Sequence, residues 1–145
     1  MSESTSTLAV EFLFTITANT GDPAPVVIPR TGGNLTVITV MSGTFEGPSM
    51  RGRVLPVAGG DWISVRDDGS MRLDVRIVLE TDDGALVYMT YGGVGLAEAD
   101  GSLALRTAPL FETADERYSW LNRLQAVATG TVGPGTVTYQ VYRLL

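Results

Sequence analysis

The chain has 145 residues and a mass of 15.4 kDa, the size of one domain with a single hydrophobic core. It contains no cysteine, no histidine and no lysine, which excludes disulfides, Cys/His zinc sites, serine–histidine triads and Schiff-base chemistry. Catalysis would have to use carboxylates, tyrosine, hydroxyls, arginine or backbone groups.

Sixteen acidic residues against ten arginines give a net charge of −6 and a pI of about 4.5, which argues against a nucleic-acid partner. No signal peptide or membrane-spanning stretch is apparent, so we expect a cytoplasmic protein that does not bind membranes. Residues 1–145 read as a single domain whose first seven residues form a disordered tail. Without histidine or cysteine, a transition metal would have only oxygen ligands, and we expect no metal and no cofactor.

The first half of the chain alternates apolar and polar residues, as expected for strands with one buried face. Prolines at positions 23, 25 and 29 make residues 19–34 a loop or an extended edge. The strand at 35–41 is expected to bend at Ser42-Gly43 and to continue to residue 46. The other strands expected in this half cover residues 8–17, 50–55 and 61–66.

The second half carries the clearest turns, because Asp-Gly at 68–69 and at 83–84 suits tight hairpins that join strands at 61–66, 71–80 and 85–91. The glycines at 92–95 read as part of a flexible loop that covers the barrel mouth. Residues 114–120 are the one place for a helical turn. Further strands are expected at 103–113, interrupted at Pro109, and at 124–132 and 136–144. The pattern predicts an all-β fold, a single closed antiparallel β-barrel of eight to ten strands.

The strand at 71–80 raises the first question of function. Leu73, Val75, Ile77 and Leu79 form one face, which looks like the core, and Asp74 and Arg76 leave from the other. The structural interpretation is a solvated face with a surface ion pair. The functional interpretation is that the polar face lines a ligand cavity, where Arg76 binds an oxyanion and Asp74 orients it or moves a proton.

Three blocks of sequence, in this order and spacing, resemble the bacterial and fungal proteins of domain-of-unknown-function family 3237. The resemblance runs from Phe12 to Tyr142 and implies a lipocalin-like β-barrel, with no settled activity. The blocks are Gly43-Thr-Phe-Glu-Gly-Pro48 through Gly59-Gly-Asp-Trp62, Leu73-Asp-Val-Arg76 through Glu80-Thr-Asp-Asp-Gly-Ala85, and Phe111-Glu-Thr113 with Tyr118-Ser-Trp-Leu-Asn122 and Gly130.

Asp61 and Trp62 follow two glycines at the start of a strand. Asp61 could be a turn or cap residue and Trp62 a core residue. Alternatively, a carboxylate beside an indole could have a raised pKa and act as a general acid or base near neutrality. The spacing leaves both interpretations open.

Tyr118, Trp120 and Asn122 would share one face of an extended segment. They would then offer a flat, hydrogen-bonding wall for a planar ligand. The favoured alternative is a plug at one end of the barrel, with Asn122 capping backbone groups. Tyr88 and Tyr142 occupy candidate inward positions and are weaker candidates for substrate binding.

The leading hypothesis is a barrel that binds a small organic molecule and performs cofactor-independent acid/base chemistry: an isomerisation, dehydration or cyclisation. Asp74 or Asp61 would move the proton, Arg76 would stabilise developing negative charge, and Trp62, Trp120 and Asn122 would shape the pocket. The alternatives are a non-catalytic carrier or sensor and a purely structural subunit. The abundance of apolar strand residues also predicts a homodimer.

Overall fold

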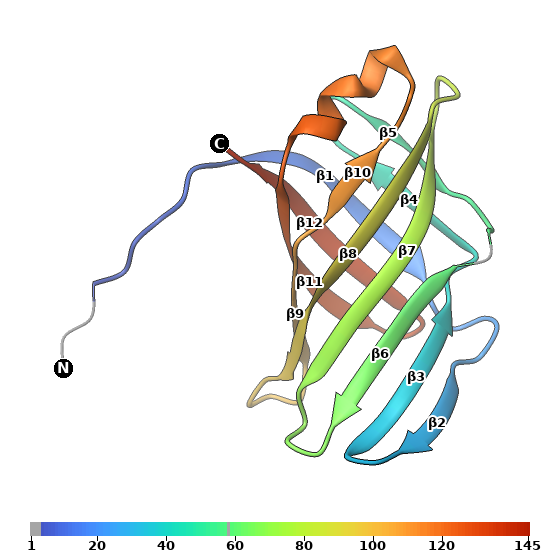
Figure 1. Ribbon diagram of the computed structural model, residues 1–145, viewed down its shortest axis with the longest axis vertical. Helices are drawn as coiled ribbons and strands as arrows, with labels where there is room; N and C mark the ends of the chain where they lie inside the picture. The colour runs from blue at the N-terminus through green and yellow to red at the C-terminus, as the bar shows by residue number, and fades with distance from the viewer. Residues whose placement is uncertain (1–3, 58) are drawn as a thin grey trace.

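The fold is a closed antiparallel β-barrel, seen in a computed structural model that describes residues 4–57 and 59–145. Hydrogen bonding runs β8-β9-β11-β12-β1-β4-β5-β7 and returns to β8, so eight strands close the ring (Figure 1). The predicted barrel is therefore confirmed. Its ring strands are β1 (Val10–Asn19), β4 (Ser42–Glu46), β5 (Arg51–Val54), β7 (Met71–Thr81), β8 (Leu86–Ala97), β9 (Leu103–Thr107), β11 (Ala126–Gly133) and β12 (Thr136–Leu144).

Three further strands extend the sheet away from the ring. β6 (Gly60–Arg66) pairs with the first part of β7, β3 (Gly33–Thr39) pairs with β6, and β2 (Val26–Arg30) forms the free edge. Figure 1 shows these three strands at the lower right, and we call them the wing. The proline-rich segment thus contains an edge strand. Pro29 is tolerated there because a free edge does not require the N–H that proline lacks.

The opposite end of the barrel is covered by the 3-10 helix η1 (Glu116–Arg123), which follows the short strand β10 (Leu110–Glu112) (Figure 1). Leu121 and Tyr118 are the buried side chains of η1, and Trp120 packs half-buried against the core. This confirms the plug. The segment is helical rather than extended, so Tyr118, Trp120 and Asn122 do not share one flat face.

The barrel interior is filled by the inward side chains of alternating positions. Leu73, Val75, Ile77 and Leu79 of β7 are all buried, which confirms the core face of this strand. Burial of each such side chain contributes roughly 1.5–3 kcal/mol. Nearer η1, Phe14 packs against Phe45 and Phe111 with ring centroids 5.4 and 5.9 Å apart.

The glycine-rich segment at 92–95 belongs to β8 and is not a flexible lid, which corrects the expectation from the sequence. Gly93 and Gly95 lie on the inward face of a continuous strand. A Cβ on Gly93 would lie 2.1 Å from the carbonyl oxygen of Arg106, and one on Gly95 would lie 2.7 Å from Met71 Cε. These glycines therefore allow close approach of neighbouring atoms rather than loop motion.

The expected tail at residues 1–7 lies partly outside the described residues, which begin at residue 4, and residues 4–9 form no strand. Within the described residues no helix has the length and apolar character that a membrane span requires.

Candidate functional site

The inner wall of the barrel carries one acidic side chain close to two tyrosines. Asp61 of β6 pairs with Val75 of β7, and Val75 pairs with Tyr91 of β8. Directly paired residues share one face of a sheet, so Asp61 and Tyr91 point to the same side as the buried Val75. Asp61 therefore faces the barrel interior.

Tyr139 of β12 completes this group from across the barrel. Its ring meets that of Tyr91 edge-on, with centroids 5.2 Å apart and an interplanar angle of 69°. Gly130, which pairs with Tyr139, leaves room for the ring, since a Cβ there would lie 2.5 Å from it. Both tyrosines are buried. We call Asp61, Tyr91 and Tyr139 the acid–phenol cluster.

Burial dominates the electrostatics of the cluster. It is the largest cause of the rise in the pKa of Asp61 to about 7. A hydrogen bond from the Asp74 backbone opposes this rise, and the negative charge of the Asp74 side chain adds to it. Burial likewise raises the pKa of Tyr91 and Tyr139, and the charge of Asp61 adds to both shifts. A side-chain hydrogen bond between the phenols raises the pKa of Tyr91 further and lowers that of Tyr139. Near neutrality the cluster holds two neutral phenols and a carboxyl group poised between its two forms.

Two buried oxygens on the inner wall have no hydrogen-bond partner in the described structure: Asp61 Oδ1 and Thr107 Oγ1. Leaving a buried polar group unpaired costs roughly 1–3 kcal/mol, and more for a charged one. A structural role would normally satisfy such atoms. The arrangement is typical of a site that awaits a ligand or transfers a proton.

The polar face of β7 lies on the outside of the barrel, so Asp74 and Arg76 do not line the barrel interior. The physical reason is the strand alternation, which places the aliphatic residues inside. Asp74, Arg76 and Trp62 instead border a surface depression of about 360 Å³. Trp62 is 51 % exposed, so it neither fills the core nor supplies the environment that raises the pKa of Asp61.

The remaining predicted residues are placed away from the acid–phenol cluster. Tyr88 and Tyr142 point outward, which corrects their assumed inward direction: the adjacent residues Val87, Met89 and Val141 occupy the core. Asn122 caps a turn, accepting a hydrogen bond from the Thr113 N–H (2.9 Å) and donating one to the Thr113 carbonyl (2.8 Å).

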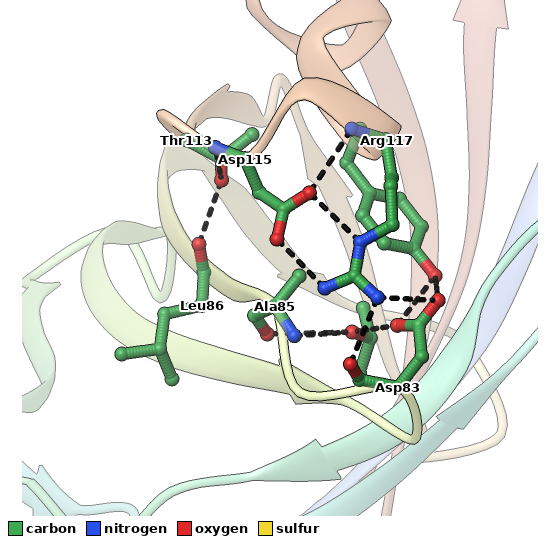
Figure 2. Close-up of polar contacts among 8 residues, drawn as sticks. Asp83, Ala85, Leu86, Thr113, Asp115 and Arg117 are labelled. Atoms are coloured by element: carbon green, nitrogen blue, oxygen red, sulfur yellow. Dashed lines mark hydrogen bonds and ion pairs between the residues drawn. The ribbon is translucent and has the colours of Figure 1, made fainter.

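A polar network fixes η1 to the β7–β8 hairpin (Figure 2). The Arg117 guanidinium donates to both carboxylate oxygens of Asp115 (3.0 and 2.8 Å) and to the Asp83 carbonyl (2.9 Å). The Tyr118 hydroxyl lies 2.9 Å from each carboxylate oxygen of Asp83, which also accepts from Thr81. Asp83 therefore organises the hairpin, as its turn sequence predicted.

Sequence reasoning identified Asp61 but missed Tyr91, Tyr139 and Thr107. The signal for Tyr91 was available: it lies an even number of residues beyond Val87 and Met89, so it belongs to their buried face. The approach of Tyr139 to Asp61 depends on ring closure, which local patterns do not specify.

The fold and the cluster together define a class: a small closed β-barrel with an apolar interior and one buried acid beside two phenols. The chain belongs to the family described as "Protein of unknown function (DUF3237)", which it matches over residues 8–144. This confirms the resemblance found in the sequence.

Relatives span most of the chain. A UPF0311 protein of Rhodopseudomonas palustris is 29 % identical over 97 % of this chain and 99 % of its own. The crystal structure of a β-barrel-like protein from Acinetobacter baumannii superimposes with a TM-score of 0.88, at 29 % identity, covering 99 % of this chain and all of that one. A Penicillium herquei protein named hydroalkoxylation enzyme phnH is 31 % identical over 83 % of this chain and 72 % of its own.

Proposed function

We propose that this protein is a cofactor-independent acid/base enzyme that acts on a small organic molecule, by isomerisation, dehydration or cyclisation. The observation that carries the proposal is the inward carboxyl group of Asp61, with an unpartnered oxygen, a pKa raised to about 7 and two buried phenols nearby. A group with this pKa both donates and accepts a proton at neutral pH, the condition for efficient general acid/base catalysis.

The proposal gives each member of the acid–phenol cluster a role. Asp61 moves the proton, and the neutral phenols of Tyr91 and Tyr139 donate hydrogen bonds to an oxygen of the substrate. Of the two candidates for moving the proton, Asp74 and Asp61, the proposal keeps Asp61. Asp74 and Arg76 take no part in the step, because they lie on the other side of the sheet.

The relative from Penicillium herquei supports acid/base chemistry without redox steps. A hydroalkoxylation adds an O–H bond across a C=C bond, so one proton is delivered to carbon and one is removed from oxygen. A single carboxyl group can do both in turn. The reaction needs no hydride or electron carrier.

The rival function is a carrier or sensor of an apolar, oxygenated ligand. A carrier needs apolar walls and no titratable group among them. The partnerless Asp61 oxygen favours the enzyme, since a carrier would bind equally well with an amide or an apolar residue at this position.

The test is turnover of a panel of small hydroxy-alkenes and β-hydroxy ketones in deuterium oxide at neutral pH. We expect wild-type protein to incorporate deuterium at carbon in at least one compound. Asp61→Asn should slow this by about 100-fold or more. Tyr91→Phe should also slow it, whereas Tyr88→Phe, on the outward face of the same strand, should not.

Two results would contradict the enzyme proposal. One is an Asp61→Asn variant as active as the wild type. The other is a wild-type protein that incorporates no deuterium into any member of the panel, which would favour the carrier.

A further inference from the structure

The inner face of the wing leads directly to Asp61. Along β6 and β3 the inward pairs are Asp61 with Ile38, Ile63 with Thr36, and Val65 with Asn34. Ile38, Thr36 and Ile63 are each half-buried. The wing therefore presents a continuous inner surface, about 13 Å long from Asp61 to Val65 at 3.3 Å per residue.

Approach to Asp61 from the other end of the barrel is obstructed. η1 covers that end, and the side chains of Phe14, Phe45 and Phe111 fill the interior beneath it. Leu79, also in this part of the core, has no exposed surface. A ligand must therefore reach the acid–phenol cluster from the wing side.

This surface carries no charge apart from Asp61, and most of its side chains are apolar. Ile63 packs half-buried against the core, as do Met71 and Val137 on the neighbouring inward positions of β7 and β12. The polar pair on the inner face of β3 is internally satisfied, since Thr36 Oγ1 donates to Asn34 Oδ1 at 2.9 Å.

The cationic groups of this region lie on the other face. Arg30 of β2 donates to Ser64 Oγ at 2.6 Å on the outward side, and Arg72 and Arg76 leave β7 from its outward face. No arginine of the wing strands faces the ligand route, so nothing there favours an anionic ligand.

We propose that the inner face of the wing, formed by Ile38, Thr36 and Ile63 and continued by Met71 and Val137, binds the aliphatic body of an uncharged ligand with an oxygen at one end. That oxygen lies at the acid–phenol cluster. The ligand class is a medium-length aliphatic chain ending in a hydroxyl. This inference rests on the proposed function, because it treats the cluster as the reacting end of the same site.

The test uses the straight-chain primary alcohols from butanol to decanol as probes, with binding followed by amide shifts in NMR spectra. Each buried methylene contributes about 0.8 kcal/mol, so we expect the dissociation constant to fall three- to fourfold per added carbon. The shifted amides should lie in β3 and β6 and around Tyr91 and Tyr139.

A matched pair of variants locates the chain. Ile63→Ala should weaken octanol binding at least fivefold. Ile28→Ala, the same change on the exposed outward face of the wing, should leave it within twofold. If Ile63→Ala does not fold, the map of shifted amides in the wild-type protein still shows whether the alcohol chain lies on the inner face of the wing.

Three results would overturn the inference: affinity that does not depend on chain length, equal effects of the two alanine variants, or a protein dimer whose contact covers Ile63 and excludes the alcohols. Asp61→Asn separates this inference from the proposed function. It should keep octanol binding within about threefold while turnover is lost. Length-dependent binding without turnover contradicts the enzyme alone, and turnover without length-dependent binding contradicts the wing site alone.

Discussion

At the scale of single residues, Asp61 is an inward acid whose charged form is disfavoured by burial. Its pKa of about 7 against an ordinary 3.8 means that the ionised form is disfavoured in the folded state, by on the order of 4 kcal/mol. A residue chosen for stability would be apolar at this inward position or would have both oxygens paired. The proposed function accounts for its presence, since a pKa near neutrality is the useful property for proton transfer.

This shift predicts how stability depends on pH. Because the pKa of Asp61 is higher in the folded than in the unfolded state, the folded state binds more protons between about pH 4 and pH 7. The stability contributed by protonated Asp61 is present below the unfolded pKa and is lost as the pH rises through about 7. Asp61→Asn should remove this loss and stabilise the protein at pH 8 by a few kcal/mol, measured by urea unfolding from pH 4 to 8.

The turn aspartates act in another pH range and do not obscure this effect. Hydrogen bonds from Ser70 and Ser102 hold the pKa values of Asp68 and Asp100 below 3.8, so their contribution is lost only as the pH falls below about 4. If the stability of Asp61→Asn declined between pH 4 and 7 as much as that of the wild type, the assignment of the pKa shift to Asp61 would be contradicted.

At the scale of elements, η1 is positioned by the β7–β8 hairpin. Tyr118 is only 8 % exposed, and its hydroxyl is within hydrogen-bond distance of both oxygens of the Asp83 carboxylate. Asp115 caps the start of η1 by accepting from the Arg117 N–H. The turn at 82–84 and the motif at 118–122 lie far apart in the sequence, but these contacts hold them together at the end of the barrel.

Loss of the Tyr118 hydroxyl should loosen this closure. Tyr118→Phe removes a hydrogen bond to a carboxylate and should lower the free energy of unfolding by about 1 kcal/mol, seen as a melting temperature about 3 °C lower. Tyr142→Phe is the control, since its side chain lies on the outer face. Equal effects of the two substitutions would show that the contact with Asp83 does not stabilise η1.

The elements themselves were largely predictable. Asp-Gly turns and period-two alternation located the hairpins and the buried face of β7, because both depend on neighbouring residues only. The inward side of β8 was misjudged where glycines interrupt the apolar pattern, although the backbone continues as a strand. Tyr88 was expected to point inward, but it lies between the buried residues Val87 and Met89 and therefore belongs to the outward face.

At the scale of the whole molecule, the barrel joins residues that no local pattern connects. Asp61 and Tyr139 are brought close only because the ring closes between β7 and β8. The family resemblance predicted a closed barrel. Which residues meet inside the barrel depends on the register of the strands, which the sequence alone does not specify. The homodimer remains a prediction. The edge strand β2 is a poor place for strand pairing between copies, because Pro29 lacks the N–H that a new ladder would need.

The central claim is that an acid with a pKa near neutrality faces the barrel interior. The most direct measurement is a carbon-13 NMR titration of the aspartate carboxyl groups, with the Asp61 resonance identified by its absence from Asp61→Asn. The account predicts a midpoint at about pH 7 for this resonance. A midpoint near pH 4, the ordinary value for an exposed aspartate, would contradict it.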